Sequence, residues 1–460
     1  MSRSRSALRV SCTSALFILQ AVPALGLAQA SPLPAISATV SATLDSIAEA
    51  HRKLLRIPGL ALVVGTPSGR VLYAANFGFA DLASLKPVSD TTTFRIFSIS
   101  KPFAAAVAHQ LVQEQYLALD APVGRYLPDL PVWRDSVTVR DVLAHTSGIE
   151  DYTDVNGWRT GVSDETAFVA TALKHPLHFS PGTGWRYSNT NFIIVQRLIE
   201  RVSGQPYPAV LKSRLLDRWS LSATTLTCSP RQLATGYLYP PEASTSPLVA
   251  TEANTFRFSP AVGGLCSTAR DVAHFFALLL SGRIVSPTAF AEMVRVSPDG
   301  VASSGAGLYA QVDAEGFVVS HGGGSDNGTS EVTAFPRDSL LVVVLANMGG
   351  ANLDELARAA RRTVLGIPQP TILDLPFAKE QFAALLGTYP NEDDPRRRVT
   401  VYEAQGQLYA LGARLLSQGD GTFVPDDARD LRVEFDYKNG IGSGVRVLRY
   451  GVVIIRARRQ

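Results

Sequence analysis

A serine and a lysine stand three residues apart where a long apolar segment begins. The stretch Phe94-Arg-Ile-Phe-Ser-Ile-Ser-Lys-Pro-Phe103 places Ser98 and Lys101 at the start of a predicted helix over residues 101–115. At this spacing the hydroxyl and the ammonium lie on the same helix face. The positive end of the helix dipole stabilises a serine oxygen that becomes anionic, and burial lowers the pKa of a lysine. The pair therefore predicts acyl transfer, with Ser98 as the nucleophile and Lys101 as the group that activates it.

A phenol and an amide two residues apart supply a second element. A serine and a lysine at this spacing also arise by chance, for example in a capped helix with a surface lysine. Further residues are therefore needed to support a catalytic role for Ser98 and Lys101. Tyr187 and Asn189 stand immediately before a predicted helix over residues 191–202. The phenol can hold the proton taken from Ser98 and deliver it to a leaving group, while the Asn189 amide orients a substrate through hydrogen bonds. The alternative for Tyr187 is an aromatic side chain packed at a helix start.

A glycine-rich strand supplies a third element. Val318-Val-Ser-His-Gly-Gly-Gly324 predicts an edge-like strand that ends in glycines, and small residues there would let a substrate backbone lie against the strand. Its backbone amides could then face the substrate. His321 is either part of this site or a structural histidine.

Strand patterns occur at both ends of the first 366 residues, and helical patterns lie between them. Residues 60–64 and 71–75 flank a Pro-Ser-Gly turn and predict a hairpin. β-Rich runs return at residues 317–320, 331–335 and 340–346. One sheet is therefore expected to take strands from both ends. The helical patterns between cover residues 101–115, 139–144, 165–173, 191–202 and 269–280.

A domain boundary is expected after residue 366. A predicted helix over residues 353–365 runs into Gly366-Ile-Pro-Gln-Pro370, which is a helix stop followed by a stiff connector. Short alternating runs follow, with residues 432–437 closed by Asn439-Gly440 and then residues 445–455, and they predict a small antiparallel β domain. No Cys, His or Ser constellation occurs there, so we expect no chemistry of its own. The expected parts are a hydrolase domain at 31–368, a linker at 369–376 and the β domain at 377–460.

The first 30 residues predict a secretory signal. Arg3, Arg5 and Arg9 precede an apolar run over residues 15–27, and Ala28-Gln-Ala30 is a small-x-small cleavage site. The apolar run is shorter than the roughly 20 residues that a membrane-spanning helix needs. We therefore expect cleavage near Ala30 and a secreted or periplasmic protein with no stable membrane anchor.

Composition narrows the class of protein. The 460 residues are 46% hydrophobic and 18% charged with a net charge of +3, which is typical of globular proteins. The basic groups are scattered, so no nucleic-acid partner is expected. Removal of the signal would leave two of the three cysteines, Cys228 and Cys266. These either pair or remain free thiols, because sequence does not give the distance between their Cα atoms.

Taken in chain order, the three elements resemble the family of serine β-lactamases and penicillin-binding proteins. Within it they resemble most the branch of class C β-lactamases, D-alanyl-D-alanine carboxypeptidases, D-aminopeptidases and esterases. Ser98 to Lys101 matches the family's Ser-x-x-Lys, Tyr187 to Asn189 its Tyr-x-Asn, and His321 to Gly323 its Lys-Thr-Gly or His-x-Gly strand motif. The resemblance covers about residues 35–365, and residues 377–460 resemble the lipocalin-like barrel of some members. Other recurring stretches lie at residues 141–148, 179–182, 202–204 and 263–268.

The resemblance implies an α/β (α+β) fold, with an antiparallel sheet flanked by helices, a helical subdomain and a small antiparallel β-barrel at the end. It implies that Ser98 attacks the substrate, that the backbone amides of Ser98 and Gly324 hold the oxyanion, and that water releases the acyl-enzyme. No metal or other cofactor is implied, and the sequence has neither a His-Glu-x-x-His motif nor enough cysteines for a zinc cage. It also has no Gly-x-Ser-x-Gly elbow, which disfavours a Ser-His-Asp hydrolase.

His321 departs from the lysine that antibiotic-hydrolysing members carry. A lysine gives a permanent positive charge for a substrate carboxylate, whereas a histidine is largely neutral near pH 7. The resemblance then implies small peptides, D-amino-acid amides or esters as substrates. The alternatives are a β-lactamase or D-alanyl-D-alanine carboxypeptidase, and a weakly catalytic penicillin-binding or sensor protein. The oligomeric state is left open.

Two further segments bear on substrate binding. Residues 234–258 are rich in Pro, Ser and Thr and predict a long loop, which either overhangs the site or is a surface connection. Glu150 and Asp151 follow the Gly148 turn. They could contact a substrate amine, but we expect a solvated turn.

Overall fold

The computed structural model describes most of the chain. The predicted signal segment, residues 1–30, lies outside the described residues. These are residues 33–158, 164–238, 247–251, 258–295, 303–392, 398–426, 428, 430–449 and 452–459.

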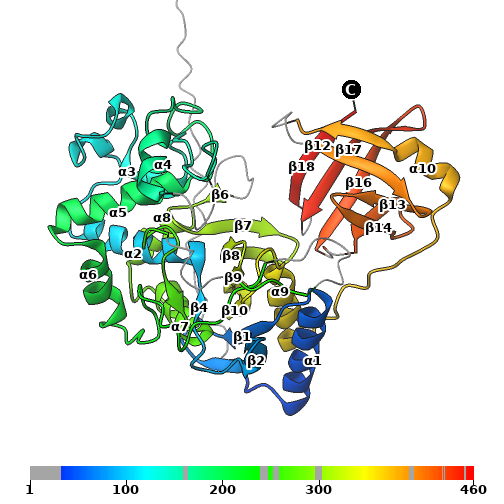
Figure 1. The fold of residues 1–460 in the computed structure, drawn as a ribbon, viewed down its shortest axis with the longest axis horizontal. Helices are drawn as coiled ribbons and strands as arrows, with labels where there is room; N and C mark the ends of the chain where they lie inside the picture. The colour runs from blue at the N-terminus through cyan, green and yellow to red at the C-terminus, as the bar shows by residue number, and fades with distance from the viewer. Residues whose placement is uncertain are drawn as a thin grey trace, which may run out of the picture.

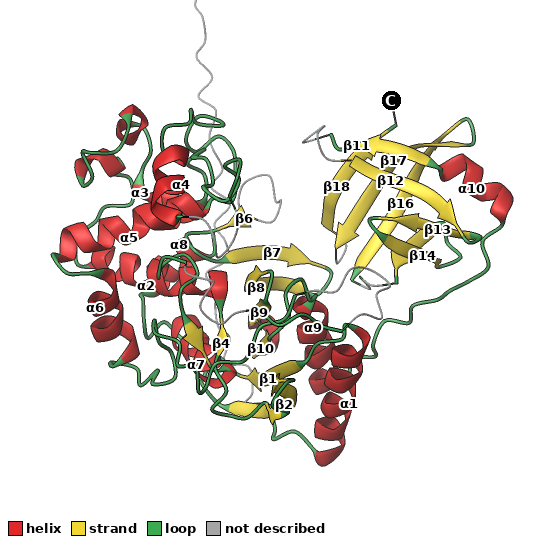
Figure 2. Ribbon diagram, in the orientation of Figure 1, coloured by secondary structure: helices red, strands yellow, loops and turns green. Residues whose placement is uncertain are grey.

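An antiparallel eight-stranded sheet forms the centre of the larger part of the molecule (Figures 1 and 2). Its strand order is β3-β2-β1-β10-β9-β8-β7-β6. The N-terminal hairpin β1–β2 pairs through β1 with β10, so one sheet does take strands from distant parts of the chain, as predicted. The strands are β1 Gly59–Gly65, β2 Val71–Asp81, β3 Lys86–Pro87, β6 Ser303–Ser304, β7 Tyr309–Asp313, β8 Gly316–Ser325, β9 Gly328–Phe335 and β10 Leu340–Ala346.

Both faces of this sheet are covered by helices, which explains why the neighbouring strands β1 and β10 are apolar throughout. Successive side chains of a strand point to opposite faces, so Leu62 of β1 belongs to one core and Val63 to the other. Helices α1 and α9 pack on the first face, and α7 packs on the second, with α2 in the same core as α7. Helix α1 is not among the helices predicted from the sequence. The bounds are α1 Ala38–Leu54, α2 Ser100–Gln113, α7 Ala269–Leu280 and α9 Leu353–Leu365.

A mainly helical part lies beside α2, as expected for the helical subdomain (Figure 1). Helix α5 packs against α2, α3 and α6. Helix α3 begins with a capping box in which Thr138 and Asp141 satisfy each other's backbone amides. The predicted helices of this region all form, with ends shifted by at most two residues. The bounds are α3 Val139–Ala144, α4 Glu165–Ala172, α5 Asn189–Ser203, α6 Tyr207–Leu211 and α8 Pro287–Met293, with short helical turns at Phe97–Ile99 (η1), Val123–Arg125, Val132–Asp135, Lys212–Leu216 and Pro336–Asp338.

The C-terminal part is a nearly closed eight-stranded antiparallel barrel in the order β11 to β18. Asn391 and Ala457 form a bridge between its first and last strands. The predicted turn at Asn439-Gly440 joins β16 to β17, and both residues have positive φ, which this two-residue turn requires. The prediction of a single run over residues 445–455 is wrong, because β17 ends at Arg449 and β18 begins at Val452. The bounds are α10 Lys379–Leu385, β11 Gly387–Pro390, β12 Arg398–Ala404, β13 Gln407–Ala410, β14 Ala413–Ser417, β15 Thr422–Pro425, β16 Leu431–Lys438, β17 Ile441–Arg449 and β18 Val452–Arg458.

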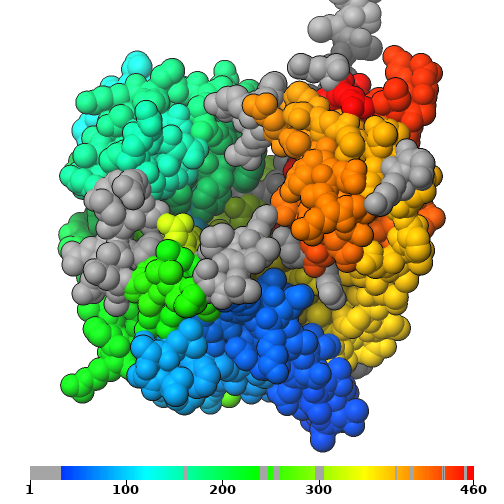
Figure 3. All heavy atoms as spheres, turned by 45° about the vertical axis from the view of Figure 1, so that its right-hand side comes forward, coloured from blue at the N-terminus to red at the C-terminus, as the bar shows by residue number. Residues whose placement is uncertain are grey.

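The barrel lies against the end of the main sheet near α9. Asn352, the N-cap residue of α9, donates a hydrogen bond through Nδ2 to Asp430 Oδ1 of the barrel at 2.7 Å. Figure 3 shows the barrel (orange) beside the segment that contains α9 (yellow) and above α1 (blue).

Cys228 and Cys266 form a disulfide, which resolves the alternative left open by the sequence. Cys266 lies in β5 (Cys266–Ser267), which pairs with β4 (Phe94–Arg95), the strand that precedes the turn containing Ser98. The disulfide therefore ties the segment around Cys228 to the short sheet that leads into the nucleophile.

Candidate active site

Ser98 lies in the short turn η1 between β4 and α2. The residue before it, Phe97, has a φ of 45°, which is rare for a residue with a side chain. A hydrogen bond from Ile96 N to Leu265 O fixes the start of this turn. The backbone at Ser98 is thus held in a sharp bend at the N-terminal end of α2, and such strain is typical of functional sites.

Lys101 is fully buried and surrounded by hydrogen-bond acceptors. Its Nζ lies 3.0 Å from Ser98 Oγ, 2.8 Å from Asn189 Oδ1 and 2.8 Å from Val262 O. Burial lowers the pKa of Lys101 from 10.5 to about 7, although the charges of Asp151 and Glu165 act in the opposite direction. At neutral pH a large share of this amine is therefore unprotonated and able to accept a proton.

Tyr187 completes the group around the nucleophile. Its hydroxyl donates a hydrogen bond to Ser98 Oγ at 2.9 Å, and its ring centroid lies 5.0 Å from Lys101 Nζ. Burial raises the pKa of Tyr187 well above 10. The phenol is therefore neutral and able to donate a proton.

His145 is a residue of this site that the sequence analysis did not single out. Its ring stacks on Tyr187 with centroids 4.4 Å apart. Its Nδ1 accepts hydrogen bonds from Ser188 N at 3.1 Å and from Asn191 Nδ2 at 3.2 Å, which leaves the other ring nitrogen to carry the proton. Burial holds its pKa well below 6.5. The family-like stretch 141–148 contained this residue, but nothing in the pattern indicated that it contacts Tyr187.

The amide of Asn189 lies between Lys101 and Asp151. Oδ1 accepts from Lys101, and Nδ2 donates to Asp151 Oδ2 at 2.9 Å. Asn189 also lines the pocket in front of Ser98, so contact with a substrate stays a prediction.

The expected solvated turn at Glu150 and Asp151 is wrong. Asp151 is only 4% exposed, because the turn folds back onto the start of α5, where Asn189 lies. The Glu150 carboxylate pairs with the Arg186 guanidinium at 3.0 Å and with His178 at 3.0 Å. Both carboxylates are therefore held by protein groups.

His321 is buried in β8 and neutral. Its Nδ1 donates to Gly322 O at 2.7 Å, which leaves Nε2 as a hydrogen-bond acceptor. Burial and the nearby charge of Lys101 lower its pKa from 6.5 to about 3. The position therefore carries no positive charge at neutral pH.

The glycines of β8 pack closely against the nucleophile's turn and line the pocket, and their contact with a substrate stays a prediction. A Cβ atom on Gly323 would lie 2.4 Å from Ile96 O and 2.9 Å from Ser98 N, so this glycine lets the strand pack against the nucleophile's own backbone. Gly324 lines the pocket, and the nearest atom to a Cβ on it would lie at 3.7 Å. Strand β8 pairs with β7 on one side only as far as Ser320. The residues after Ser320 pair with β9 alone, so only this last part of β8 has a free edge.

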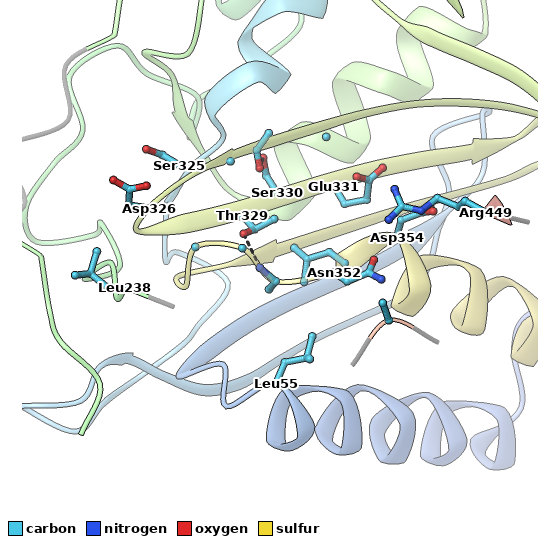
Figure 4. Close-up of a pocket in the computed structure, with 18 residues that line it drawn as sticks. Leu55, Leu238, Ser325, Asp326, Thr329, Ser330, Glu331, Asn352, Asp354 and Arg449 are labelled. Atoms are coloured by element: carbon cyan, nitrogen blue, oxygen red, sulfur yellow. Dashed lines mark hydrogen bonds between the residues drawn. The ribbon is translucent and has the colours of Figure 1, made fainter. Parts of the chain in front are cut away.

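A pocket of about 320 Å³ opens in front of Ser98. It shares three residues of the β8–β9 hairpin, Gly324, Ser325 and Asp326, with a larger chamber of about 1020 Å³ between the sheet and the barrel. Figure 4 shows Ser325 and Asp326 at one end of this chamber and the barrel's Arg449 near Asp354 and Glu331 at the other. The small pocket is lined by residues that include Ser98, Trp158, Asn189, Phe258 and Gly324.

The predicted loop over residues 234–258 is described only in part. Tyr237 is buried, and its hydroxyl accepts a hydrogen bond from Leu82 N at 2.7 Å, so this side chain anchors the loop. Leu238 lines the chamber, and Phe258 lines the pocket at Ser98. Tyr239 and most of the remaining loop lie outside the described residues.

Within the described residues, no three His, Cys, Asp or Glu side chains are grouped as a metal site would require. None of the described helices is long and apolar enough to cross a membrane.

Comparisons with known proteins match most of the chain. The family model described as Beta-lactamase matches residues 44–366. Penicillin-binding protein 4* of Bacillus subtilis (strain 168) is 25% identical over 411 residues, which cover 82% of this chain and 90% of that protein. Esterase EstB of Burkholderia gladioli is 33% identical over 193 residues, which cover 38% of this chain and 48% of the esterase.

A solved structure of a D-stereospecific amidohydrolase from Streptomyces sp. is also similar. It is 26% identical with a TM-score of 0.59, and the match covers 70% of this chain and 98% of the amidohydrolase.

Proposed function

This chain belongs to the beta-lactamase family and is a serine hydrolase, and from that premise we propose that it hydrolyses small peptides, D-amino-acid amides or esters through an acyl-enzyme on Ser98. The observation that carries the proposal is that Lys101 Nζ and the Tyr187 hydroxyl both lie within hydrogen-bond distance of Ser98 Oγ, at 3.0 and 2.9 Å. The two groups that could carry a proton, Lys101 and Tyr187, thus both contact the oxygen atom that would react.

In the proposed acylation step, neutral Lys101 takes the proton of Ser98 as Oγ bonds to the substrate carbonyl carbon. The backbone amides of Ser98 and Gly324, which both line the pocket, would hold the oxyanion. Collapse of the intermediate breaks the bond to the leaving group, which receives a proton from Tyr187, and Tyr187 regains one from the Lys101 ammonium. Water then attacks the acyl carbon, gives a proton to Lys101 and releases the acid, and Ser98 recovers its proton.

The neutral His321 supports a substrate without an obligatory carboxylate. A carboxylate near a buried neutral imidazole would lose its hydration without gaining an opposite charge. The similarity to an esterase and to a D-stereospecific amidohydrolase supports the same substrate classes. We therefore rank ester and amide hydrolysis above β-lactamase or D-alanyl-D-alanine carboxypeptidase activity.

Two measurements test this proposal. Intact-mass analysis after treatment with a fluorophosphonate is expected to show an adduct that Ser98→Ala abolishes, and an adduct that persists in Ser98→Ala would assign the nucleophile elsewhere. A panel of p-nitrophenyl esters, D-amino-acid p-nitroanilides and nitrocefin is then expected to show turnover of the first two classes above that of nitrocefin. An adduct without turnover of any of them would instead indicate a binding or sensor protein.

We also propose export, with cleavage near Ala30. The disulfide between Cys228 and Cys266 supports this, because disulfides persist in oxidising compartments. N-terminal sequencing of the protein recovered from the periplasm or medium of an expressing bacterium is expected to begin at or near Ser31. Retention of the intact N-terminus in the cytoplasm would contradict export.

A further inference from the structure

Asp151 is a buried carboxylate at the end of a chain of hydrogen bonds that leads to the nucleophile. Its Oδ2 accepts from Asn189 Nδ2, Asn189 Oδ1 accepts from Lys101 Nζ, and Lys101 Nζ contacts Ser98 Oγ. We propose that Asp151 is a positioning residue of the reaction, which acts through Asn189 to direct the electron pair of Lys101 at Ser98. The inference rests on the proposed roles of Ser98 and Lys101.

Asp151 sets the direction in which the Asn189 amide faces. An ionised carboxylate only accepts hydrogen bonds, so Asp151 binds the NH2 side of the amide and turns the oxygen toward Lys101. Without that carboxylate the amide could rotate and present its NH2 group to the lysine. Asp151 therefore guarantees that Lys101 has an acceptor at this position.

The hydrogen-bond partners of Lys101 fix the direction of its electron pair when the amine is neutral. A neutral amine has two N–H bonds and one electron pair. Asn189 Oδ1 and Val262 O cannot donate, so each must receive one of the two N–H bonds. The third direction of Nζ is the one toward Ser98 Oγ, 3.0 Å away. The electron pair consequently faces the proton that has to be removed.

The charge of Asp151 also acts on the pKa of Lys101. The ionisable side chains around Lys101 are Asp151 and Glu165, which favour its ammonium form, together with the histidines 145 and 321 and Tyr187, which are held in neutral forms. Burial raises the pKa of Asp151, and the charge of Asp154 adds to this rise, whereas hydrogen bonds from the backbone of Thr153 and Asn189 and from the Thr153 side chain oppose it. Removing the charge of Asp151 should therefore favour the neutral form of Lys101.

The test compares Asp151→Asn with Asp154→Asn, a matched variant three residues away whose carboxylate is exposed and pairs with Arg186. The rate of Ser98 modification by a fluorophosphonate and kcat/KM for a p-nitrophenyl ester are measured from pH 5 to 10. For Asp151→Asn we expect the plateau rate at high pH to fall by about tenfold to a hundredfold, because the electron pair of Lys101 is no longer directed at Ser98. We also expect the acid limb to move down by about one pH unit, because a nearby negative charge is lost. Asp154→Asn should change neither.

A merely structural role of Asp151 would lower the rate without shifting the pH at which the rate rises, and that result would overturn the inference. A pH–rate profile of Asp151→Asn identical to that of the wild type would also overturn it. Asp151→Glu, which restores the charge, should return the limb toward the wild-type position. If Asp151→Asn does not fold, Asp151→Ser provides a smaller neutral side chain for the same comparison. Absence of any adduct in the wild-type protein would instead refute the proposed function, so the two failures are distinguishable.

Discussion

The chemistry of the site depends on what burial does to Lys101 and Tyr187, which contact Ser98 Oγ, and to His321, which interacts electrostatically with Lys101. Lys101 has a lowered pKa, Tyr187 a raised one, and His321 a lowered one. Desolvation favours the neutral form in every case. The site therefore combines a neutral amine that accepts a proton with a neutral phenol that donates one.

The pH profile of the reaction should report Lys101. The neutral amine is the active form, so kcat/KM is expected to rise with pH through about 7 and then to level off. The measurement is kcat/KM for a p-nitrophenyl ester, corrected for spontaneous hydrolysis. His321→Gln should leave the position of this limb unchanged, because the pKa of His321 is lowered to about 3 and the ring is already neutral. If the rise of kcat/KM with pH disappeared in His321→Gln, that rise would have to be assigned to the histidine instead of Lys101.

Among the elements, strand β8 and the turn η1 must approach each other closely for Ser98 to face the pocket. Gly323→Ala would place a Cβ 2.4 Å from Ile96 O, so we expect a loss of about 1–3 kcal/mol in the free energy of unfolding and a large loss of activity. Gly324→Ala meets no atom closer than 3.7 Å and serves as the control for stability. Urea denaturation of both variants tests this, and equal stability of the two would contradict the role of Gly323.

The disulfide links two elements covalently, because it joins β5 to the segment that includes Cys228. It closes a loop of 38 residues. Its loss in the double variant Cys228→Ser/Cys266→Ser should cost about 2–4 kcal/mol in the free energy of unfolding, because the unfolded chain gains freedom. Reduced wild-type protein should match the variant. An unchanged denaturation midpoint in both would show that the cross-link contributes no stability.

At the scale of the whole molecule, Glu331 lies where the sheet, α9 and the barrel meet around the large chamber (Figure 4). Burial and the neighbouring Asp354 raise the pKa of Glu331 from 4.5 to about 8. The folded protein therefore binds more protons than the unfolded chain between these values, and its stability falls as pH rises through this range.

Glu331→Gln removes this dependence. The free energy of unfolding of the variant is compared with that of the wild type at each pH. We expect this difference to be more favourable to the variant at pH 9 than at pH 5, by about 1–2 kcal/mol. Denaturation at the two pH values measures the difference, with the exposed Glu403→Gln of β12 as the control. An equal effect of Glu331→Gln at both pH values would mean that the carboxyl group ionises normally.

The sequence by itself determined features that depend on neighbours a few residues away. Ser98 and Lys101 share a helix face because of their spacing, α9 ends at Leu365 because Gly366 follows it, and Asn439-Gly440 makes a hairpin. Strand and helix patterns predicted one sheet with strands from both ends, helices between them and a small antiparallel β domain, because these depend on local backbone preference and on the alternation of apolar residues. The helical subdomain and the barrel were expectations from the resemblance in motif order.

Only the tertiary structure decided which groups lose contact with water and which residues far apart in the chain meet. Asp151 seemed solvated in a polar turn, yet α5 buries it against Asn189, and His145 is brought onto Tyr187 from a different element. The close approach of Gly323 to the backbone of Ser98 also appears only in the packed chain. The cysteine pairing and the extent of the free edge of β8 also depend on long-range packing. Desolvation and pairing between distant segments are properties of the packed chain, and they set the pKa values and the hydrogen-bond partners that make this serine reactive.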